Sequence, residues 1–265
     1  CGALQNLAAN VDNRMDIAQK GGIESIVMAL QQHPTHADVQ ENGCRALMNL
    51  AGNNDIKVAI AEKGGIETSV ASLQQNPTHA AVQENGCMAL LFLANIADNK
   101  VAIAQKGGIE AIVAALQHHP TYADVQEHGC GALQNLAANV DNRMDIAQKG
   151  GIESIVMALQ QHPTHADVQE NGCRALMNLA GNNDIKVAIA EKGGIETSVA
   201  SLQQNPTHAA VQENGCMALL FLANIADNKV AIAQKGGIEA IVAALQHHPT
   251  YADVQEHGCG ALQNL

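Results

Sequence analysis

The stretch that decides the fold is residues 39–51, VQENGCRALMNLA, because a close copy of it returns every 43 residues. Its cysteine is the clearest marker of this period. The seven cysteines stand at positions 1, 44, 87, 130, 173, 216 and 259. A fixed period of this size predicts a helical solenoid, in which stacked repeats bury one continuous core.

A longer repeat lies above the first one. Residues 1–129 recur letter for letter as 130–258, and 259–265 repeat 1–7. Three repeat types therefore alternate, each present twice. We expect one solenoid over 1–265 that starts with a partial third helix at 1–9, followed by repeats 10–52, 53–95, 96–138, 139–181, 182–224 and 225–265.

Each repeat begins with a short helix that ends at a pair of glycines. In the first repeat this helix carries Met15 and Ile17, and Asp12 or Asn13 is placed to cap it. The glycines at 21–22 permit a sharp chain reversal at its end.

A second, amphipathic helix follows the glycines. Glu24 lies in its first turn, where the helix dipole favours an acid, and Pro34 closes the segment. Its apolar residues fall at i, i+3, i+4 and i+7, which makes one buried stripe. They are Ile23, Ile26, Val27 and Leu30.

The third helix is the longest and contains the repeated stretch. Thr35 and Asp38 form a capping-box pattern at its start, and we expect it to run to about Ala51. Gly43 costs about 1 kcal/mol of helix propensity relative to alanine, so its recurrence predicts close approach of a neighbouring helix. The expected buried face is Val39, Gly43, Cys44, Leu47 and Leu50.

Composition restricts the partners and the compartment. The net charge of -12 and the absence of Lys/Arg runs argue against nucleic acid. No stretch has the roughly 18 apolar residues of a membrane span, and no leader is visible. Equivalent cysteines of stacked repeats lie about 10 Å apart, too far for disulfides. We therefore expect buried free thiols and an intracellular, reducing compartment, cytoplasmic or nuclear.

Catalytic and metal-binding patterns are not found. The Gly-Gly pairs lack the Lys-Ser/Thr of a phosphate-binding loop, and the periodic cysteines have no recurring base beside them. Histidines gather between second and third helices, but Asn76 stands where neighbouring repeats have His33 and His119. We therefore expect no enzyme, no cofactor and no metal site.

Two motifs give the chain a family resemblance. The run IAxKGGIExIVxAL at 17–30 and the run ALxNLA at 46–51 resemble the armadillo repeat over essentially all 265 residues. The resemblance implies an all-α, right-handed superhelical solenoid. HEAT repeats, an alternative α-solenoid, lack the short first helix and the Gly-Gly turn.

The resemblance also implies a binding groove. Armadillo proteins bind extended peptides along their third helices, where an asparagine holds the ligand backbone. An amide suits this task because it can donate to a peptide carbonyl and accept from a peptide N–H. The matching residues are Asn6, Asn49, Asn135, Asn178 and Asn264.

The chain departs from the family pattern at two positions. Phe92 and Phe221 replace the asparagine in one repeat type, and they either pack into the core or cover the groove. The family's tryptophan, four residues before the asparagine, is also missing. It is replaced by Gly2, Arg45, Met88, Gly131, Arg174, Met217 and Gly260.

Glutamates stand one turn before those positions, on the same helix face. Glu41 can pair with Arg45, and the copy of this pair is Glu170 with Arg174, whereas Glu84 faces Met88. The acidic row predicts a preference for Lys/Arg-containing protein segments; its alternative is a solvated helix face. Its members are Glu41, Glu84, Glu127, Glu170, Glu213 and Glu256.

Two functions remain open from the sequence. The first is a protein- or peptide-binding scaffold that uses the third-helix groove. The second is an architectural or engineered array that self-associates end to end and has no evolved ligand. The identical 129-residue blocks favour the second, since old copies diverge, and end-to-end contacts of this kind are heterologous and can propagate.

Overall fold

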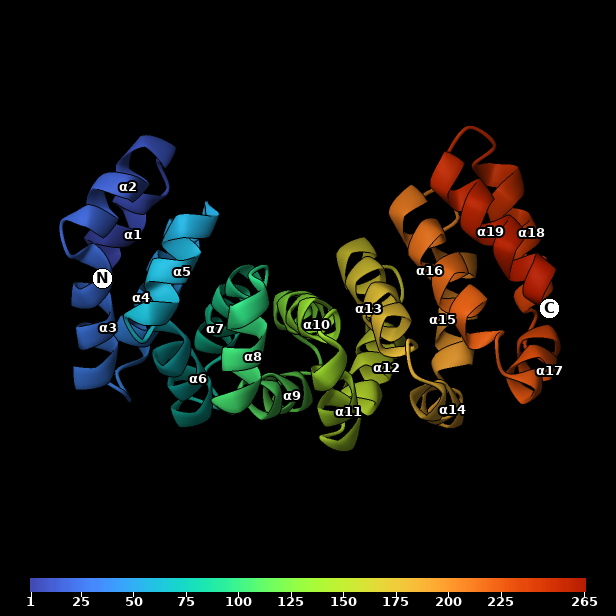
Figure 1. The fold of residues 1–265 in the computed structure, drawn as a ribbon, viewed down its shortest axis with the longest axis horizontal. Helices are drawn as coiled ribbons and strands as arrows, with labels where there is room; N and C mark the ends of the chain where they lie inside the picture. Colours follow the sequence, from blue (N-terminus) through green and yellow to red (C-terminus); the bar gives the residue numbers. More distant parts are fainter. The chain divides into compact units, whose positions relative to one another are not determined.

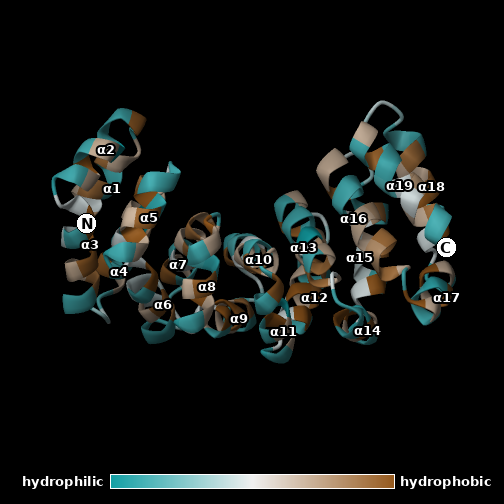
Figure 2. Ribbon diagram, viewed as in Figure 1, coloured by the Kyte–Doolittle hydropathy of each residue, from teal (hydrophilic) through white to brown (hydrophobic).

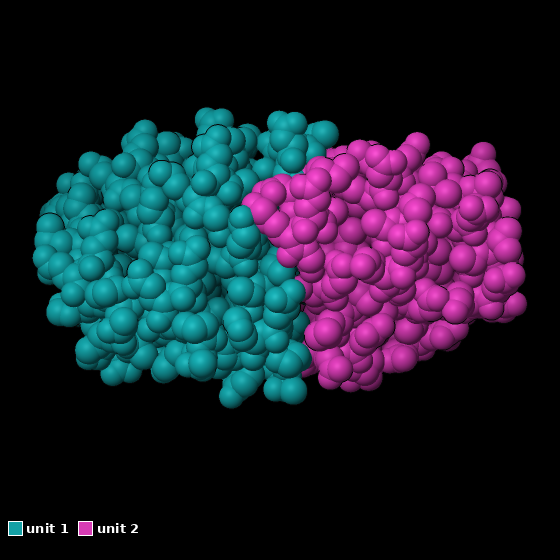
Figure 3. Space-filling view, turned by 90° about the horizontal axis from the view of Figure 1, so that it is seen from below, with its two compact units in different colours: residues 1–142 teal, residues 143–265 magenta.

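The computed structural model describes all 265 residues and is entirely helical, with 19 helices and no strand (Figure 1). The chain divides into two compact units, residues 1–142 (unit 1) and residues 143–265 (unit 2), coloured separately in Figure 3. Each unit has its own internal packing. The predicted all-α fold class is confirmed. A single solenoid over residues 1–265 stays a prediction.

Unit 1 opens with α1 (Gly2–Ala8) and then follows the 43-residue period, with a first, a second and a third helix in each period. The first helices are α2 (Val11–Gln19), α5 (Asn54–Glu62) and α8 (Ala97–Gln105). The second helices are α3 (Gly22–Gln32), α6 (Gly65–Gln75) and α9 (Gly108–His118). The third helices are α4 (Ala37–Leu50), α7 (Ala80–Leu93) and α10 (Ala123–Ala137).

Unit 2 has the same order of helices, and the division between the units falls within its first helix, α11. The first helices are α11 (Val140–Gln148), α14 (Asn183–Glu191) and α17 (Ala226–Gln234). The second helices are α12 (Gly151–Gln161), α15 (Gly194–Gln204) and α18 (Gly237–His247). The third helices are α13 (Ala166–Leu179), α16 (Ala209–Leu222) and α19 (Ala252–Asn264).

Within each unit, helices of one kind lie side by side. In unit 1 the third helices α4, α7 and α10 contact one another in turn, and so do the second helices α3, α6 and α9 (Figure 1). In unit 2 the same two rows are formed by α13, α16 and α19 and by α12, α15 and α18. Each unit therefore presents a surface made only of third helices.

The glycine pair between first and second helices behaves as predicted. Gly21 has φ 79°, in the left-handed region that favours glycine, and Gly22 begins α3. A Cβ on Gly22 would lie 2.7 Å from the carbonyl oxygen of Ile17. The predicted apolar stripe of α3 is buried, since each member is at most 5% exposed: Ile23, Ile26, Val27 and Leu30.

The predicted helix caps are wrong in both places. The α2 helix is capped by Asn10, whose Oδ1 accepts a hydrogen bond from the backbone N–H of Asp12 at 2.9 Å. The α4 helix starts one residue after His36 without a side-chain cap bond. Thr35 cannot cap it because the turn after Pro34 continues to His36, whose N–H bonds the carbonyl of residue 33.

Gly43 and its copies lie where the third helix meets the second helix of the same repeat. A Cβ on Gly43 would overlap the side chain of Leu30, and a Cβ on Gly86 would lie 2.5 Å from Cδ2 of Leu73. Close approach is therefore the reason for the glycine, as predicted. The rest of the expected face is buried except Val39, which is half-buried, whereas its copy at position 82 is fully buried.

A buried glutamine in the repeated stretch joins the same two helices. Nε2 of Gln40 donates to the carbonyl oxygens of Leu30 and His33 at 2.9 and 2.8 Å. These carbonyls end α3 and have no partner within the helix. The sequence reasoning missed this role, although one glutamine per repeat in a core-facing register is its signal: Gln40, Gln83, Gln126, Gln169, Gln212 and Gln255.

Adjacent repeats are also joined through the loops that precede the third helices. Nδ2 of Asn76 donates to the carbonyl of Pro34 at 2.9 Å, and Nε2 of His119 lies 2.7 Å from the carbonyl oxygen of Pro77. Asn76 therefore interrupts the histidine pattern but keeps its hydrogen bond. His119 and its copy His248 therefore connect adjacent repeats through these loops.

Hydrophobic and hydrophilic residues both occur along the helices (Figure 2). None of them carries an apolar run long enough to cross a lipid bilayer.

Candidate binding surface

The predicted site residues lie on the third helices in short rows. Residues at i, i+4 and i+8 share one helix face, so each third helix presents three side chains in line. In unit 1, row A on α4 is Glu41, Arg45 and Asn49; row B on α7 is Glu84, Met88 and Phe92; row C on α10 is Glu127, Gly131 and Asn135. Unit 2 repeats them on α13, α16 and α19.

Row A is neutralised within the protein. Nη2 of Arg45 lies 3.0 Å from Oε1 of Glu41, and its Nε donates to Oδ1 of Asn85 on the next third helix at 2.9 Å. The same arrangement holds in unit 2, where Nε of Arg174 donates to Oδ1 of Asn214 at 3.0 Å. The predicted pairing of Glu41 with Arg45 is confirmed. Arg45 also holds neighbouring third helices together, which the sequence did not reveal.

The asparagines of rows A and C bond to the preceding third helix. Nδ2 of Asn49 donates to the carbonyl of Gln5 at 3.0 Å, and Nδ2 of Asn135 donates to that of Leu91 at 3.0 Å. In unit 2, Asn264 reaches the carbonyl of residue 220 at 3.3 Å. Each of these amides therefore donates one N–H group to a hydrogen bond within the protein. The amide of Asn135 also donates to Oδ1 of Asn95 and accepts from Nε2 of Gln134, both at 3.4 Å, so Asn49 keeps more of its hydrogen-bonding capacity for a ligand than Asn135 does.

Row B carries an acid without a salt bridge. Glu84 is half-buried, and its burial raises the pKa of the carboxyl group, as does the nearby Asp124. Arg45 opposes this rise but stays bonded to Glu41. Negative charge on row B is therefore compensated only in part.

The phenylalanine of row B does not enter the core. The side chain of Phe92 is 37% exposed, and that of Phe221 is 36% exposed. Of the two predicted arrangements, burial in the core is thus wrong. The row joins an exposed ring, a half-buried Met88 and an acid on one face of α7.

Row C contains a second acidic group and a histidine. Nε2 of His128 lies 3.6 Å from Oε1 of Glu127. Burial lowers the pKa of His128, although Asp124 acts in the opposite direction.

Glycine takes the family's tryptophan position in row C. In unit 2, a Cβ on Gly260 would lie 3.4 Å from Cδ1 of Leu220 on the preceding third helix. A side chain at position 260 would therefore contact the neighbouring leucine.

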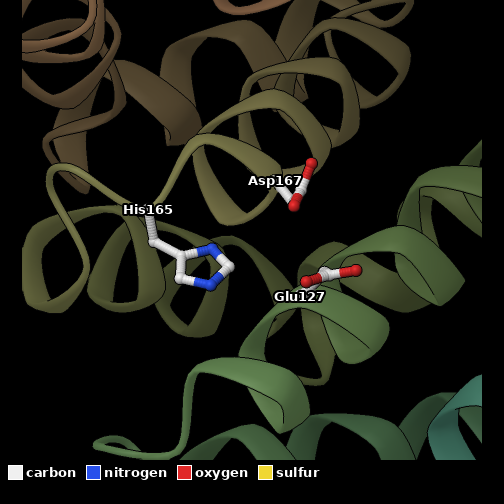
Figure 4. Close-up of side chains that lie close together, drawn as sticks. All are labelled: Glu127, His165 and Asp167. Carbon is white, nitrogen blue, oxygen red and sulfur yellow. The ribbon is translucent and has the colours of Figure 1, made fainter.

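A metal site at row C has no support within either unit. Figure 4 labels Glu127, which belongs to α10 of unit 1, and His165 and Asp167, which belong to unit 2. Within either unit, no three His, Cys, Asp or Glu side chains lie close enough together to hold a metal ion. Nδ1 of His165 already accepts from the backbone N–H of Val168 at 3.4 Å.

The second-helix surface differs from the third-helix surface in its electrostatics. Its glutamates pair with the lysine of the next repeat: Lys63 lies 2.9 Å from Glu24, and Lys192 lies 2.8 Å from Glu153. Glu67 and Glu196 are paired in the same way with Lys106 and Lys235, whereas Glu84 and Glu213 on the third helices have no salt bridge.

The inner cysteines are buried and unreactive. Burial raises the pKa of the Cys44 and Cys173 thiols to about 11 and that of Cys216 to about 12. All seven cysteines are free. A nucleophilic cysteine needs a lowered pKa and access to solvent, so these thiols pack the core.

Comparison with known proteins agrees with the helix arrangement. The sequence model of the LRRK2 ARM repeat matches residues 2–265. None of the curated proteins matches this sequence.

Solved structures with the same fold include engineered proteins. One has 32% identity and a TM-score of 0.86 over 99% of this chain, which spans 62% of that protein's length. A designed armadillo repeat protein has 22% identity and a TM-score of 0.79, covering 92% of this chain and 99% of that one. A chain from a structure concerning the interaction between cadherin and β-catenin has 19% identity and a TM-score of 0.84, covering 98% of this chain and 51% of that one. The last two show the fold alone.

Proposed function

This chain belongs to the armadillo repeat family, and we propose that it is a binding scaffold that holds an extended, Lys/Arg-containing protein segment across its third helices. Its matches are repeat scaffolds and not enzymes. The structure concerning cadherin and β-catenin supports a protein as the partner class.

The observation that carries the proposal is the difference in charge between the two surfaces. Glu24 and Glu67 on the second helices are paired with lysines, whereas Glu84 on the third-helix surface has no salt bridge. Asn49, also on the third-helix surface, adds an amide oxygen that can accept a hydrogen bond. A surface rich in acceptors and negative charge favours a ligand rich in donors and positive charge.

A binding titration tests this proposal. A fluorescent, extended lysine-serine peptide is expected to bind, and a glutamate-serine peptide of the same length is not. The double variant Arg45→Met/Arg174→Met gives row A and its copy the methionine that row B has at this position. It removes the ion-pair partners of Glu41 and its copy Glu170. Two uncovered carboxylates are expected to raise the affinity for the lysine peptide by about three- to tenfold at low salt.

The asparagine rows are tested separately. Asn49→Ala/Asn178→Ala removes two amides from the third-helix surface and is expected to weaken peptide binding. Gln31→Ala/Gln160→Ala removes two exposed amides from the second helices and is the matched control. Equal binding by both variants would show that the groove is not the site.

The alternative function is an array that associates end to end. The identical 129-residue blocks favour it, and the engineered neighbours are consistent with it. Light scattering over a concentration series decides the point, because a strictly monomeric profile excludes stacking.

A further inference from the structure

Row B interrupts the asparagine series with a residue of different chemistry. Phe92 and Phe221 are the only phenylalanines of the chain, and both are more than one-third exposed. Exposing an aromatic ring to water is unfavourable, because apolar surface gains free energy when it is removed from solvent. Row B thus offers apolar contact area where rows A and C offer an amide.

The same row carries an acid without a salt bridge. Glu84 has no cation of its own, since Met88 occupies the place that Arg45 has in row A. Eight residues separate Glu84 from Phe92, which places their Cα atoms about 12 Å apart along α7. Row B therefore has an acidic end at Glu84 and an apolar end at Phe92, separated by about 12 Å along the helix axis.

This separation matches one geometry of an extended chain. Neighbouring side chains of an extended segment point to opposite sides, so the tips of a lysine and an adjacent apolar residue lie roughly 10 Å apart. A segment that crosses the third helix at Met88 would direct one side chain toward Glu84 and its neighbour toward Phe92.

We infer that row B is a subsite for a basic–apolar residue pair of an extended partner segment, with Glu84 receiving the cation and Phe92 the apolar side chain. Glu213 and Phe221 form the second copy in unit 2. This inference rests on the proposed function. It adds which side chains of the partner segment the scaffold selects, namely a basic residue next to an apolar one. Phe92 and Phe221 are then specificity-determining residues, because they replace main-chain recognition by apolar contact.

Two short peptides test the inference. One carries Lys-Leu pairs separated by serine, and the other has serine in place of each leucine, so both have the same charge. Burying the leucine side chains against row B is expected to make the first peptide bind about five- to tenfold more tightly. The measured quantity is the ratio of the two dissociation constants, obtained by fluorescence anisotropy.

The decisive variant is Phe92→Asn/Phe221→Asn, which installs the residue that rows A and C already carry. The ratio is expected to fall to about one. Met28→Asn/Met157→Asn is the control, because it removes exposed apolar side chains from the second helices in the same number. The control should keep the ratio of the unsubstituted protein.

The outcomes separate the two proposals. A ratio that stays at five or more in Phe92→Asn/Phe221→Asn overturns the subsite, and so does a ratio of one in the unsubstituted protein. If neither lysine peptide binds, the proposed function itself fails. Glu84→Gln/Glu213→Gln completes the test, since loss of the acid should weaken both peptides and reduce the salt dependence of binding.

Discussion

Replacement of the buried glutamine in the repeated stretch is the sharpest test of how the repeat is held together. In Gln83→Leu, the carbonyl oxygens of Leu73 and Asn76 lose the Nε2 donor that lies 2.8 and 2.9 Å away. The carbonyl of Asn76 keeps the backbone N–H of His79, whereas that of Leu73 is left without a donor because residue 77 is a proline. A buried acceptor without a partner costs about 1–3 kcal/mol, so the expected loss is about 1–3 kcal/mol.

Urea unfolding followed by circular dichroism measures the loss. Hydrogen exchange locates it, since protection should fall first at the end of α6 and the start of α7. Gln74→Leu is the control, because Gln74 is exposed on α6, and surface substitutions usually stay within about 0.5 kcal/mol. If Gln83→Leu loses no more than this control, the two hydrogen bonds do not support the repeat.

A charged variant at the same position gives a pH signature. In Gln83→Glu, only the protonated carboxyl can donate to a carbonyl, so burial and this hydrogen bond raise its pKa in the folded state. A raised pKa contributes stability below the unfolded value that is lost as pH rises through the folded value. The variant is therefore expected to approach the unsubstituted protein in acid and to fall behind it at neutral pH.

Three further predictions concern the core, the ion pairs and the thiols. Gly86→Ala should destabilise the protein by about 1 kcal/mol in urea, because overpacking of 1–3 kcal/mol exceeds a propensity gain of about 1 kcal/mol. The hydrogen bond from Lys63 lowers the pKa of the Glu24 carboxyl group, so this ion pair stabilises the folded protein near neutral pH and ceases to do so as the pH falls through that lowered pKa. Glu24→Gln removes the ion pair and should destabilise the protein near neutral pH. Thermal unfolding between pH 3 and 7 should show the variant's deficit closing in acid. Maleimide should label the exposed Cys259 in the folded protein but reach Cys44 only after unfolding, as mass spectrometry would show.

The buried surfaces of the repeat followed from the sequence. The spacing of Ile23, Ile26, Val27 and Leu30 predicted the buried stripe of α3, and the recurrence of Gly43 predicted a close helix contact. Both depend on helix periodicity, which is local. The pairing of Glu41 with Arg45 was predictable for the same reason, because residues four apart on a helix are neighbours.

The tertiary structure decided what depends on the next helix or the next repeat. Arg45 bonds to Asn85 across 40 residues, and Asn49 bonds to Gln5 across 44. The side chain of Gln40 donates a hydrogen bond to the carbonyl of Leu30 near the end of α3, ten residues earlier in the chain. Such bonds are set by the offset between stacked helices, which periodicity alone does not specify.

The candidate binding surface on the third helices shows the same division. The sequence determined which residues share the rows on the third helices, whereas only packing showed that Arg45 is already occupied and that Phe92 stays exposed. A helix face is fixed by the position of a residue along its own helix. Its exposure and its free hydrogen-bonding capacity depend on the neighbour that packs against it.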